Sequence, residues 1–519
     1  MRAHNTLRIA LTHSPLLRRP AVLVMLLAAL LVFAFQGTRG IWDPDEGRFT
    51  NVALQMLQTG DFVSLYRHHE SLHFTKPPVT YWAIAASVSV FGWNEWAARL
   101  PNALAFLAVV ALLLRIGRHF SPQRPWLPAL IYATMPVPLL AAHVVTTDTP
   151  LAFATTLALA CYAIARFEAR PGFIVGMWAA FGLAFMTKGP PGLLGLAAVV
   201  VFHFSRKGGL HKGGLHLFPP LGLIAFALIG FTWYALVISR HEGLLAYFLY
   251  DEVFERVATD IHHRNPQWWG GFYVYGLTLG LGTLPWWPWA VAVARRVGLR
   301  WRNADEPTRL LLVWIGVSLL IFMLSRSRLA LYVLPLFAPL ALLFGRALQH
   351  MAWRWTRMTA LALFAAGVVG LKALLASMPH WAHLLPAAQA ARLPLHKNAR
   401  QWADDLRVVV PFAPTEVVFV NDMARYGLHL YLRAQIEKID FDGDLARKPV
   451  SDAPFDDTVY DDLREPGVSG RVFVMRPWAQ QRFEVMARDA GWQPAYLGPV
   501  QDHVVYRLSR PPTQATEAR

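Results

Sequence analysis

Three carboxylates and one lysine, carried by two short segments, are the side chains of this chain best suited to chemistry. The first segment is Trp42-Asp43-Pro44-Asp45-Glu46-Gly47-Arg48-Phe49, which follows directly on an apolar run. The second is His73-Phe74-Thr75-Lys76-Pro77-Pro78. Charge at the mouth of a membrane span is costly to hold and usually marks a functional site. A carboxylate there can act as a general base, and a lysine can stabilise developing negative charge.

The composition predicts a membrane protein that crosses the bilayer several times. The chain has 519 residues, of which 55% are hydrophobic and 16% are charged, whereas soluble proteins carry about 25% charged residues. The net charge of +16 needs no nucleic-acid partner, because basic residues of membrane proteins collect in cytoplasmic loops. Cys161 is the single cysteine, which excludes a disulfide framework and a cysteine metal cluster.

Apolar runs of the length that a bilayer requires predict about eleven transmembrane helices. They lie near 20–36, 95–116, 125–143, 150–167, 172–187, 190–205, 215–239, 270–294, 308–324, 329–346 and 358–377. If the N-terminus is cytoplasmic, the basic clusters around Arg115, Arg166, Lys207, Arg295 and Arg346 all fall on the cytoplasmic face. The segment 79–91 is apolar but short, so we expect an interfacial helix at the outer surface rather than a span.

This topology places the candidate site residues on the outer face. They include the acids and Lys76 of the first outer loop, 37–94, and Asp148 in the sequence Thr147-Asp148-Thr149. Lys188, Arg326 and Arg328 fall on the same face, where the positive-inside rule does not favour them. Binding of an anion is one reason to keep cations there.

The sequence after residue 377 predicts a small α/β domain, 378–519, which follows a transmembrane domain over 1–377. Apolar β-branched runs predict strands at 417–420, 471–475 and 503–506, and helical spacing predicts helices at 426–432 and 480–490. An odd number of spans places this domain outside the cytoplasm, in the periplasm if the cell is Gram-negative. It carries no phosphate loop, paired-histidine metal motif or nucleophile elbow, so we expect no catalysis from it.

Each candidate also has a structural interpretation. Asp45 and Glu46 could favour a helix N-terminus, with Asp43 as its cap, and Asp148 could cap a later helix. Lys76 could extend its side chain to the lipid headgroups. His262 and His263 could suggest a metal, yet no further ligands stand at a usable spacing, and contact with phosphate is the alternative. Arg326 and Arg328 could contact headgroups or grip a phosphate.

These motifs together resemble the membrane glycosyltransferases that use polyprenyl-phosphate sugars, namely protein O-mannosyltransferases and lipid A aminoarabinose transferases. The matching pieces, collinear over about 35–345, are Asp45-Glu46-x-Arg48-Phe49, Phe74-x-Lys76-Pro77-Pro78, Asn94-Glu95-x-x-x-Arg99, Thr147-Asp148, Lys188-Gly189-Pro190, His263-Arg264-x-Pro266 and Ser325-Arg326-Ser327-Arg328 with Tyr332-x-Leu334-Pro335. The resemblance implies a C-type glycosyltransferase (GT-C) fold with 11 to 13 transmembrane helices.

The resemblance also implies roles for single residues. Asp45 would be the main catalytic carboxylate, Asp148 a second acid near it, and Glu46 is grouped with them. Lys76 would bind the donor phosphate. Its companions would be Arg48, His263, Arg264, Arg326, Arg328 and Tyr332. Thr75 stands where aminoarabinose enzymes usually carry glutamate, so the resemblance leaves the sugar open.

The implied reaction transfers 4-amino-4-deoxy-L-arabinose, or a related pentose or hexose, from undecaprenyl phosphate to lipid A at the periplasmic face of a bacterial inner membrane. Attack from the side opposite the phosphate predicts inversion. A protein acceptor, or transport of a lipid-linked sugar instead of transfer, are the alternatives. No cofactor is demanded by the motifs, and a divalent metal is compatible with the reaction but not required.

Overall fold

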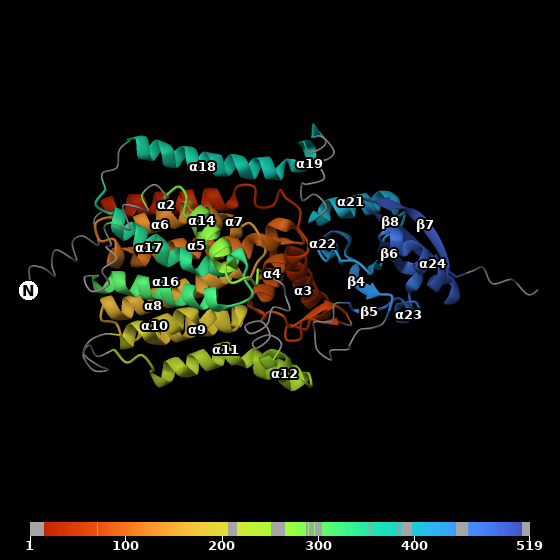
Figure 1. Cartoon of the computed structure of the whole chain (residues 1–519), viewed down its shortest axis with the longest axis horizontal. Helices are drawn as coiled ribbons and strands as arrows, with labels where there is room; N and C mark the ends of the chain where they lie inside the picture. The colour runs from red at the N-terminus through yellow and green to blue at the C-terminus, as the bar shows by residue number, and fades with distance from the viewer. Residues whose placement is uncertain are drawn as a thin grey trace, which may run out of the picture. The chain divides into compact units, whose positions relative to one another are not determined.

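The structure is a computed structural model that describes residues 15–69, 71–205, 215–250, 265–286, 289, 295, 304–351, 355–381, 384–385, 397–442 and 455–510 (Figure 1). Its contacts divide the chain into two compact units. The helical unit comprises Met1–Gln36 and Arg99–Leu375, and the sheet unit comprises Gly37–Ala98 and Ala376–Arg519. By its contacts, the segment 37–98, which the sequence analysis grouped with the transmembrane domain, packs with the C-terminal segment.

The helical unit consists of apolar helices, which confirms a multi-pass helical membrane protein. Six helices in the described part are long and apolar enough to span a bilayer: Glu95–Phe120, Asp148–Phe167, Pro220–Arg240, Glu306–Leu324, Ala330–Leu348 and Thr359–Ala376. The elements are α2 (Pro15–Phe33), α5 (Glu95–Phe120), α6 (Leu127–Thr134), α7 (Pro136–Ala141), α8 (Asp148–Phe167), α9 (Phe173–Lys188), η1 (Pro190–Leu193), α10 (Leu194–Phe204), α11 (Pro220–Arg240), α12 (Leu244–Leu249), α14 (Gly270–Gly282), α16 (Glu306–Leu324), η4 (Ala330–Leu336), α17 (Phe337–Leu348) and α18 (Trp355–Ala376).

Proline and glycine mark two breaks in the helical unit. The run predicted at 125–143 is split into α6 and α7 because Met135, before Pro136, takes an extended backbone with ψ 127°. Helix α9 ends at Gly189, whose φ of +71° favours glycine, and the next two residues are prolines that open η1. The first break gives two short helices where the sequence pattern predicted a single span, whereas the second falls between the predicted spans 172–187 and 190–205.

Basic residues gather at one end of the helical unit. Glu168, just after α8, pairs with Arg115 at 2.8 Å and Arg118 at 2.6 Å, both from the end of α5. Arg166 pairs with Glu306 of α16 at 2.8 Å. Asp148 begins α8 and Glu168 follows its end, so a helix of 20 residues, about 30 Å long, separates the basic end from Asp148.

The sheet unit is built on a six-stranded mixed sheet of order β5-β4-β3-β6-β8-β7. The four strands β5, β4, β3 and β6 are parallel to one another. Strand β8 is antiparallel to both of its neighbours, β6 and β7. The elements are α3 (Asp45–Thr59), β1 (Tyr66–His68), β2 (Ser71–Leu72), α4 (Val79–Phe91), α19 (Met378–Trp381), α21 (Ala399–Val409), β3 (Glu416–Val420), α22 (Leu428–Leu432), β4 (Gln435–Asp440), β5 (Asp457–Thr458), α23 (Val459–Asp462), η7 (Val468–Gly470), β6 (Arg471–Met475), η8 (Pro477–Ala479), α24 (Gln480–Asp489), β7 (Gln493–Val500) and β8 (His503–Ser509).

Both faces of the central strand β3 are buried. Val417 and Phe419 join one hydrophobic cluster with Trp402 of α21, while Val418 and Val420 join another with Phe483 of α24. Alternate residues of a strand point to opposite faces, so a continuous apolar strand suits a sheet that is covered on both sides. The strands predicted at 417–420, 471–475 and 503–506 are confirmed as β3, β6 and β8.

Candidate active site

Asp148, Lys188 and Tyr332 meet inside the helical unit. The Lys188 ammonium, at the end of α9, forms a buried ion pair with Asp148 Oδ1 at the start of α8. The same ammonium lies 4.5 Å from the centroid of the Tyr332 ring, which belongs to η4. Thr146 Oγ1 donates to Asp148 Oδ2 at 3.0 Å. Asp148 is therefore held through both carboxylate oxygens, and it does not act as the N-cap, since Thr147 occupies that position.

The turn that carries Asp148 is positioned by Asn102, a residue that the sequence analysis missed. The Asn102 side-chain amide donates to the carbonyls of Val144, at 2.5 Å, and Thr146, at 3.2 Å. Asn102 is buried in α5, more than forty positions away in sequence. Local spacing could not have indicated this pairing, although Asn102 stands three residues after Arg99, the last residue of one matching motif.

Arg328 is a buried cation whose charge is not balanced by an ion pair with any carboxylate of the described residues. Its guanidinium is 4% exposed and donates to three backbone carbonyls, those of Asn265 (2.9 Å), Gln267 (2.6 Å) and Met323 (3.0 Å). Its Nε has no hydrogen-bond partner among the described residues. Such a group favours a bound anion.

Glycines at the start of α14 make room for this guanidinium. A Cβ on Gly270 would lie 2.5 Å from the Asn265 carbonyl oxygen and 3.2 Å from Arg328 Nη1. A Cβ on Gly271 would lie 2.7 Å from the Met323 sulfur and 3.3 Å from Arg328 Nε. The absence of side chains at these two positions allows α14 to approach Arg328 closely.

In the sheet unit, Asp45 and Arg48 form an exposed pair on the first turn of α3. Arg48 Nη2 lies 2.6 Å from Asp45 Oδ1, and the Asp45 side chain is 70% exposed. Glu46 points the other way: its Oε2 accepts from Arg39 Nη1 at 2.7 Å and from the Trp42 amide at 2.9 Å. The two neighbouring acids therefore differ, because Asp45 is open to solvent whereas Glu46 is buried and fixes the entry to α3.

Asp43 is buried and does not cap α3, so the interpretation of Asp43 as a helix cap is wrong. Its Oδ1 accepts from the Gly427 amide at 3.0 Å, and its Oδ2 has no hydrogen-bond partner among the described residues. Burial raises the Asp43 pKa to about 7, against the lowering effect of the Gly427 amide and Arg425. A Cβ on Gly47 would lie within 1.8 Å of Asp43 Oδ1, which explains the glycine in this motif.

Lys76 is half-buried just before α4, and its ammonium donates to the Thr75 carbonyl at 2.5 Å. Thr75 Oγ1 in turn contacts His73 Nε2 at 2.8 Å. Helix α4 packs against α3, with the rings of Tyr81 and Phe49 5.7 Å apart. Asp45 is the first residue of α3, and Lys76 stands three residues before the start of α4. The helix predicted at 79–91 is present with these bounds.

The predicted site residues thus form two groups. The helical unit holds Asp148, Arg328 and Tyr332. It also holds Arg326, which is exposed and stands two residues before Arg328. Asp45, Glu46, Arg48 and Lys76 lie in the sheet unit. His263 and Arg264 fall outside the described residues.

Comparison with known proteins gives the class of this molecule. Its fold is similar to that of ArnT from Cupriavidus metallidurans, in a crystal structure bound to undecaprenyl phosphate, with a TM-score of 0.72 and 22% identity over 93% of this chain and 97% of that one. The apo structure of the same protein gives a TM-score of 0.70. The class is a polytopic helical membrane protein with a C-terminal mixed-sheet domain.

Sequence comparison finds one similar family model and several similar proteins. The family described as dolichyl-phosphate-mannose-protein mannosyltransferase matches residues 75–233. An undecaprenyl phosphate-alpha-4-amino-4-deoxy-L-arabinose arabinosyl transferase of Pseudomonas fluorescens is 30% identical over 69% of this chain, and one of Aeromonas hydrophila is 32% identical over 59%. The matches span 65% and 56% of those relatives' own length, less than two thirds. Over the matched residues the chain is similar to these membrane glycosyltransferases, in agreement with the resemblance predicted from its motifs.

Proposed function

We propose that this protein transfers a sugar from undecaprenyl phosphate to lipid A, with 4-amino-4-deoxy-L-arabinose as the first sugar to test. The observation that carries the proposal is Arg328, a buried guanidinium with three carbonyl partners and an unused Nε donor. A lipid phosphate supplies the negative charge that such a group favours. The names of the relatives, and the undecaprenyl phosphate bound to ArnT, support the choice of donor.

In the proposed reaction the bond between the anomeric carbon and the phosphate oxygen breaks, and a bond to an acceptor oxygen forms. Negative charge grows on the leaving phosphate, which Lys76 and Arg328 would stabilise, with Arg48, Arg326, His263, Arg264 and Tyr332 as further contacts. Asp45 would accept the proton of an acceptor hydroxyl, or orient the acceptor where it is itself a phosphate. Asp148, held by Lys188, would keep that lysine beside Tyr332. Attack opposite the phosphate gives inversion.

The orientation that we propose has a cytoplasmic N-terminus and a periplasmic site. It is supported by the basic end of the helical unit, where Arg115, Arg118 and Arg166 lie together, about one bilayer thickness from Asp148. We propose that 37–98 and the C-terminal domain are periplasmic as well. About eleven spans, in a GT-C arrangement, fit this orientation.

The experiment compares Asp45→Asn with Asp404→Asn in purified protein that is supplied with donor and lipid A. Asp404 is a matched control, because it also forms an exposed i,i+3 pair, with Arg407 at 2.9 Å. We expect Asp45→Asn to lower turnover by about 10²-fold or more and Asp404→Asn to leave it unchanged. Near-normal turnover in Asp45→Asn would contradict the assignment of Asp45.

The acceptor is tested by mass spectrometry of lipid A and of envelope glycoproteins from cells with and without the gene. A sugar missing from lipid A supports the proposal. A sugar missing from proteins instead supports the protein acceptor, which the description of the family matched at 75–233 favours. No change in either would contradict transfer and support transport.

A further inference from the structure

Three side chains that commonly bind metal ions come together in the sheet unit. His68 ends β1, His69 follows it, and Glu416 begins β3. One ligand atom from each lies within 4.8 Å of the others. His68 and Glu416 are 1% and 4% exposed, while His69 is exposed at the surface. An ion could therefore enter from solvent and reach two ligands that are fixed in the interior.

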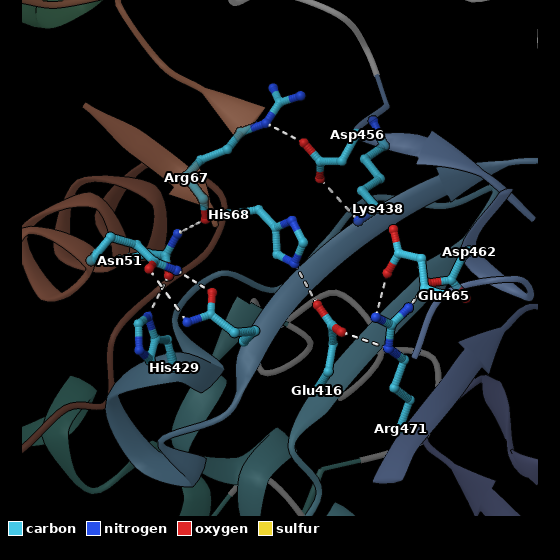
Figure 2. Close-up of polar contacts among 12 residues, drawn as sticks. Asn51, Arg67, His68, Glu416, His429, Lys438, Asp456, Asp462, Glu465 and Arg471 are labelled. Atoms are coloured by element: carbon cyan, nitrogen blue, oxygen red, sulfur yellow. Dashed lines mark hydrogen bonds and ion pairs between the residues drawn. The ribbon is translucent and has the colours of Figure 1, made fainter. Parts of the chain in front are cut away.

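The surrounding residues hold the Glu416 carboxylate in a ligating orientation. Its Oε2 lies 2.8 Å from Arg471 Nε, and its Oε1 lies 2.5 Å from His68 Nε2 (Figure 2). Glu416 and Arg471 are also aligned in register on the parallel strands β3 and β6. Metal-binding carboxylates are typically fixed by hydrogen bonds from outside the metal site, and Arg471 would have that role here, whereas the His68 contact would be replaced by the bonds of both side chains to the ion.

The charges around Glu416 leave room for a further cation. Arg471 contacts three carboxylates at once: besides Glu416 it pairs with Asp462 and Glu465 (Figure 2). The Arg471 guanidinium balances only one of these three negative charges, and the Glu416 and Asp462 carboxylates are buried. His68 also has a buried Nδ1 with no hydrogen-bond partner among the described residues. A cation next to Glu416 would be favoured by the excess of carboxylates.

We propose that His68, His69 and Glu416 bind one divalent transition-metal ion, with Zn²⁺ as the best match. Two imidazoles and a carboxylate are a common zinc set that leaves a fourth, open position for water. Mg²⁺ and Ca²⁺ prefer oxygen ligands and are disfavoured by the two histidines. Zinc bonds of about 2.0–2.2 Å require the ligand atoms to adjust, which the exposed His69 side chain can do by turning toward the ion.

The ion would fasten the β1–β2 hairpin to the central sheet. His68 and Glu416 are separated by 348 positions in sequence, so a motif search could not find the site. The proposed site goes beyond the transfer reaction, since none of these residues belongs to the proposed catalytic set. Metal binding should therefore raise the stability of the sheet unit.

The test uses the full-length protein in detergent, stripped with a chelator and then dialysed against Zn²⁺. Metal content is measured by mass spectrometry for wild type, His69→Ala and His350→Ala. His350 is a matched control, because it is also an exposed histidine. We expect wild type and His350→Ala to hold about one more Zn²⁺ per chain than His69→Ala. Zinc that is bound elsewhere on the protein contributes equally to wild type and His69→Ala, so it cancels when their metal contents are compared.

Co²⁺ gives a second readout that does not depend on activity. The tetrahedral absorption of bound Co²⁺ should appear in wild type and be lost in His69→Ala and in Glu416→Gln. Zn²⁺ should also raise the midpoint of thermal unfolding of wild type but not of His69→Ala. Equal zinc content in wild type and His69→Ala, or no bound zinc in wild type, would overturn the proposal.

Discussion

Asp43 shows how one buried residue couples the first acidic motif to pH. Burial favours the neutral carboxyl group and raises its pKa from 3.8 to about 7. The folded protein therefore holds a proton that the unfolded chain releases near pH 4. As pH rises from about 4 to about 7, this proton is lost and the stability that it contributes is lost with it.

Asp43→Asn should remove this pH dependence, because the amide carbonyl can still accept from the Gly427 amide. Between pH 5 and pH 8, the wild type loses stability until Asp43 is deprotonated near pH 7. The free energy of unfolding of the variant should therefore rise by about 3 kcal/mol relative to wild type over this range. Thermal unfolding at both pH values measures the difference. Asp404→Asn, at an exposed position, should show no such change. The same stability difference at both pH values would argue against a raised Asp43 pKa.

Arg328 makes a prediction about recognition of the donor. Arg328→Lys keeps the charge but loses the planar group that reaches three carbonyls and still offers Nε. We expect the KM for the lipid donor to rise about tenfold, or roughly 1.4 kcal/mol. Arg124→Lys is the control, since Arg124 likewise donates to a backbone carbonyl, that of Met351 at 2.7 Å. An unchanged donor KM in Arg328→Lys would remove Arg328 from the phosphate site.

At the scale of elements, the Asp148–Lys188 pair joins the start of α8 to the end of α9. Removing one member leaves a buried charge without its partner, at a cost of about 3–5 kcal/mol, whereas removing both costs much less than the sum. Asp148→Asn, Lys188→Met and the double variant should show this coupling in thermal unfolding. The more exposed Arg166–Glu306 pair, treated likewise, should give weaker coupling. Additive effects at Asp148 and Lys188 would contradict the buried pair.

Elements with a clear apolar pattern could be predicted, and those whose burial depends on polar pairing could not. The run expected at 150–167 is α8, and the helix expected at 79–91 is α4. Strand β4 was missed because its sequence, QIEKID, carries four polar or charged residues. Glu437 of this strand is nevertheless only 1% exposed. Burial, together with the nearby carboxylate of Asp462 in α23, raises the pKa of Glu437.

The site was predictable in residue types but not in contacts. The spacing indicated Asp148, Lys188 and Arg328 as unusual charges, yet their partners come from elements that are distant in the sequence, such as the carbonyls of Asn265 and Gln267. Likewise, the helix predicted at 426–432 begins at Leu428. The amide of Gly427, just before it, is bound by Asp43, 384 positions away.

At the scale of the whole molecule, the segment 37–98 and the C-terminal segment form one unit. Glu95 Oε1 accepts from Arg400 Nε and from the Tyr431 hydroxyl, each at 2.7 Å. Asn51 of α3 contacts His429 of α22 at 2.6 Å (Figure 2). Burial lowers the His429 pKa to about 3, so this histidine is neutral at physiological pH and the contact is a neutral hydrogen bond.

This organisation predicts that 37–98 unfolds together with the sheet. Trp402→Ala removes a fully buried side chain from the sheet unit, at a cost of about 3–5 kcal/mol. Hydrogen exchange should then become faster in α3 as well as in β3 and β4, and stay unchanged in α8 and α9. Trp314→Ala, in α16 of the helical unit, is the matched control and should give the reverse pattern. If α3 keeps its protection while β3 loses it in Trp402→Ala, the two segments do not fold as one unit, and the hydrogen bonds of Glu95 and Asn51 contribute little to holding the acidic motif in place.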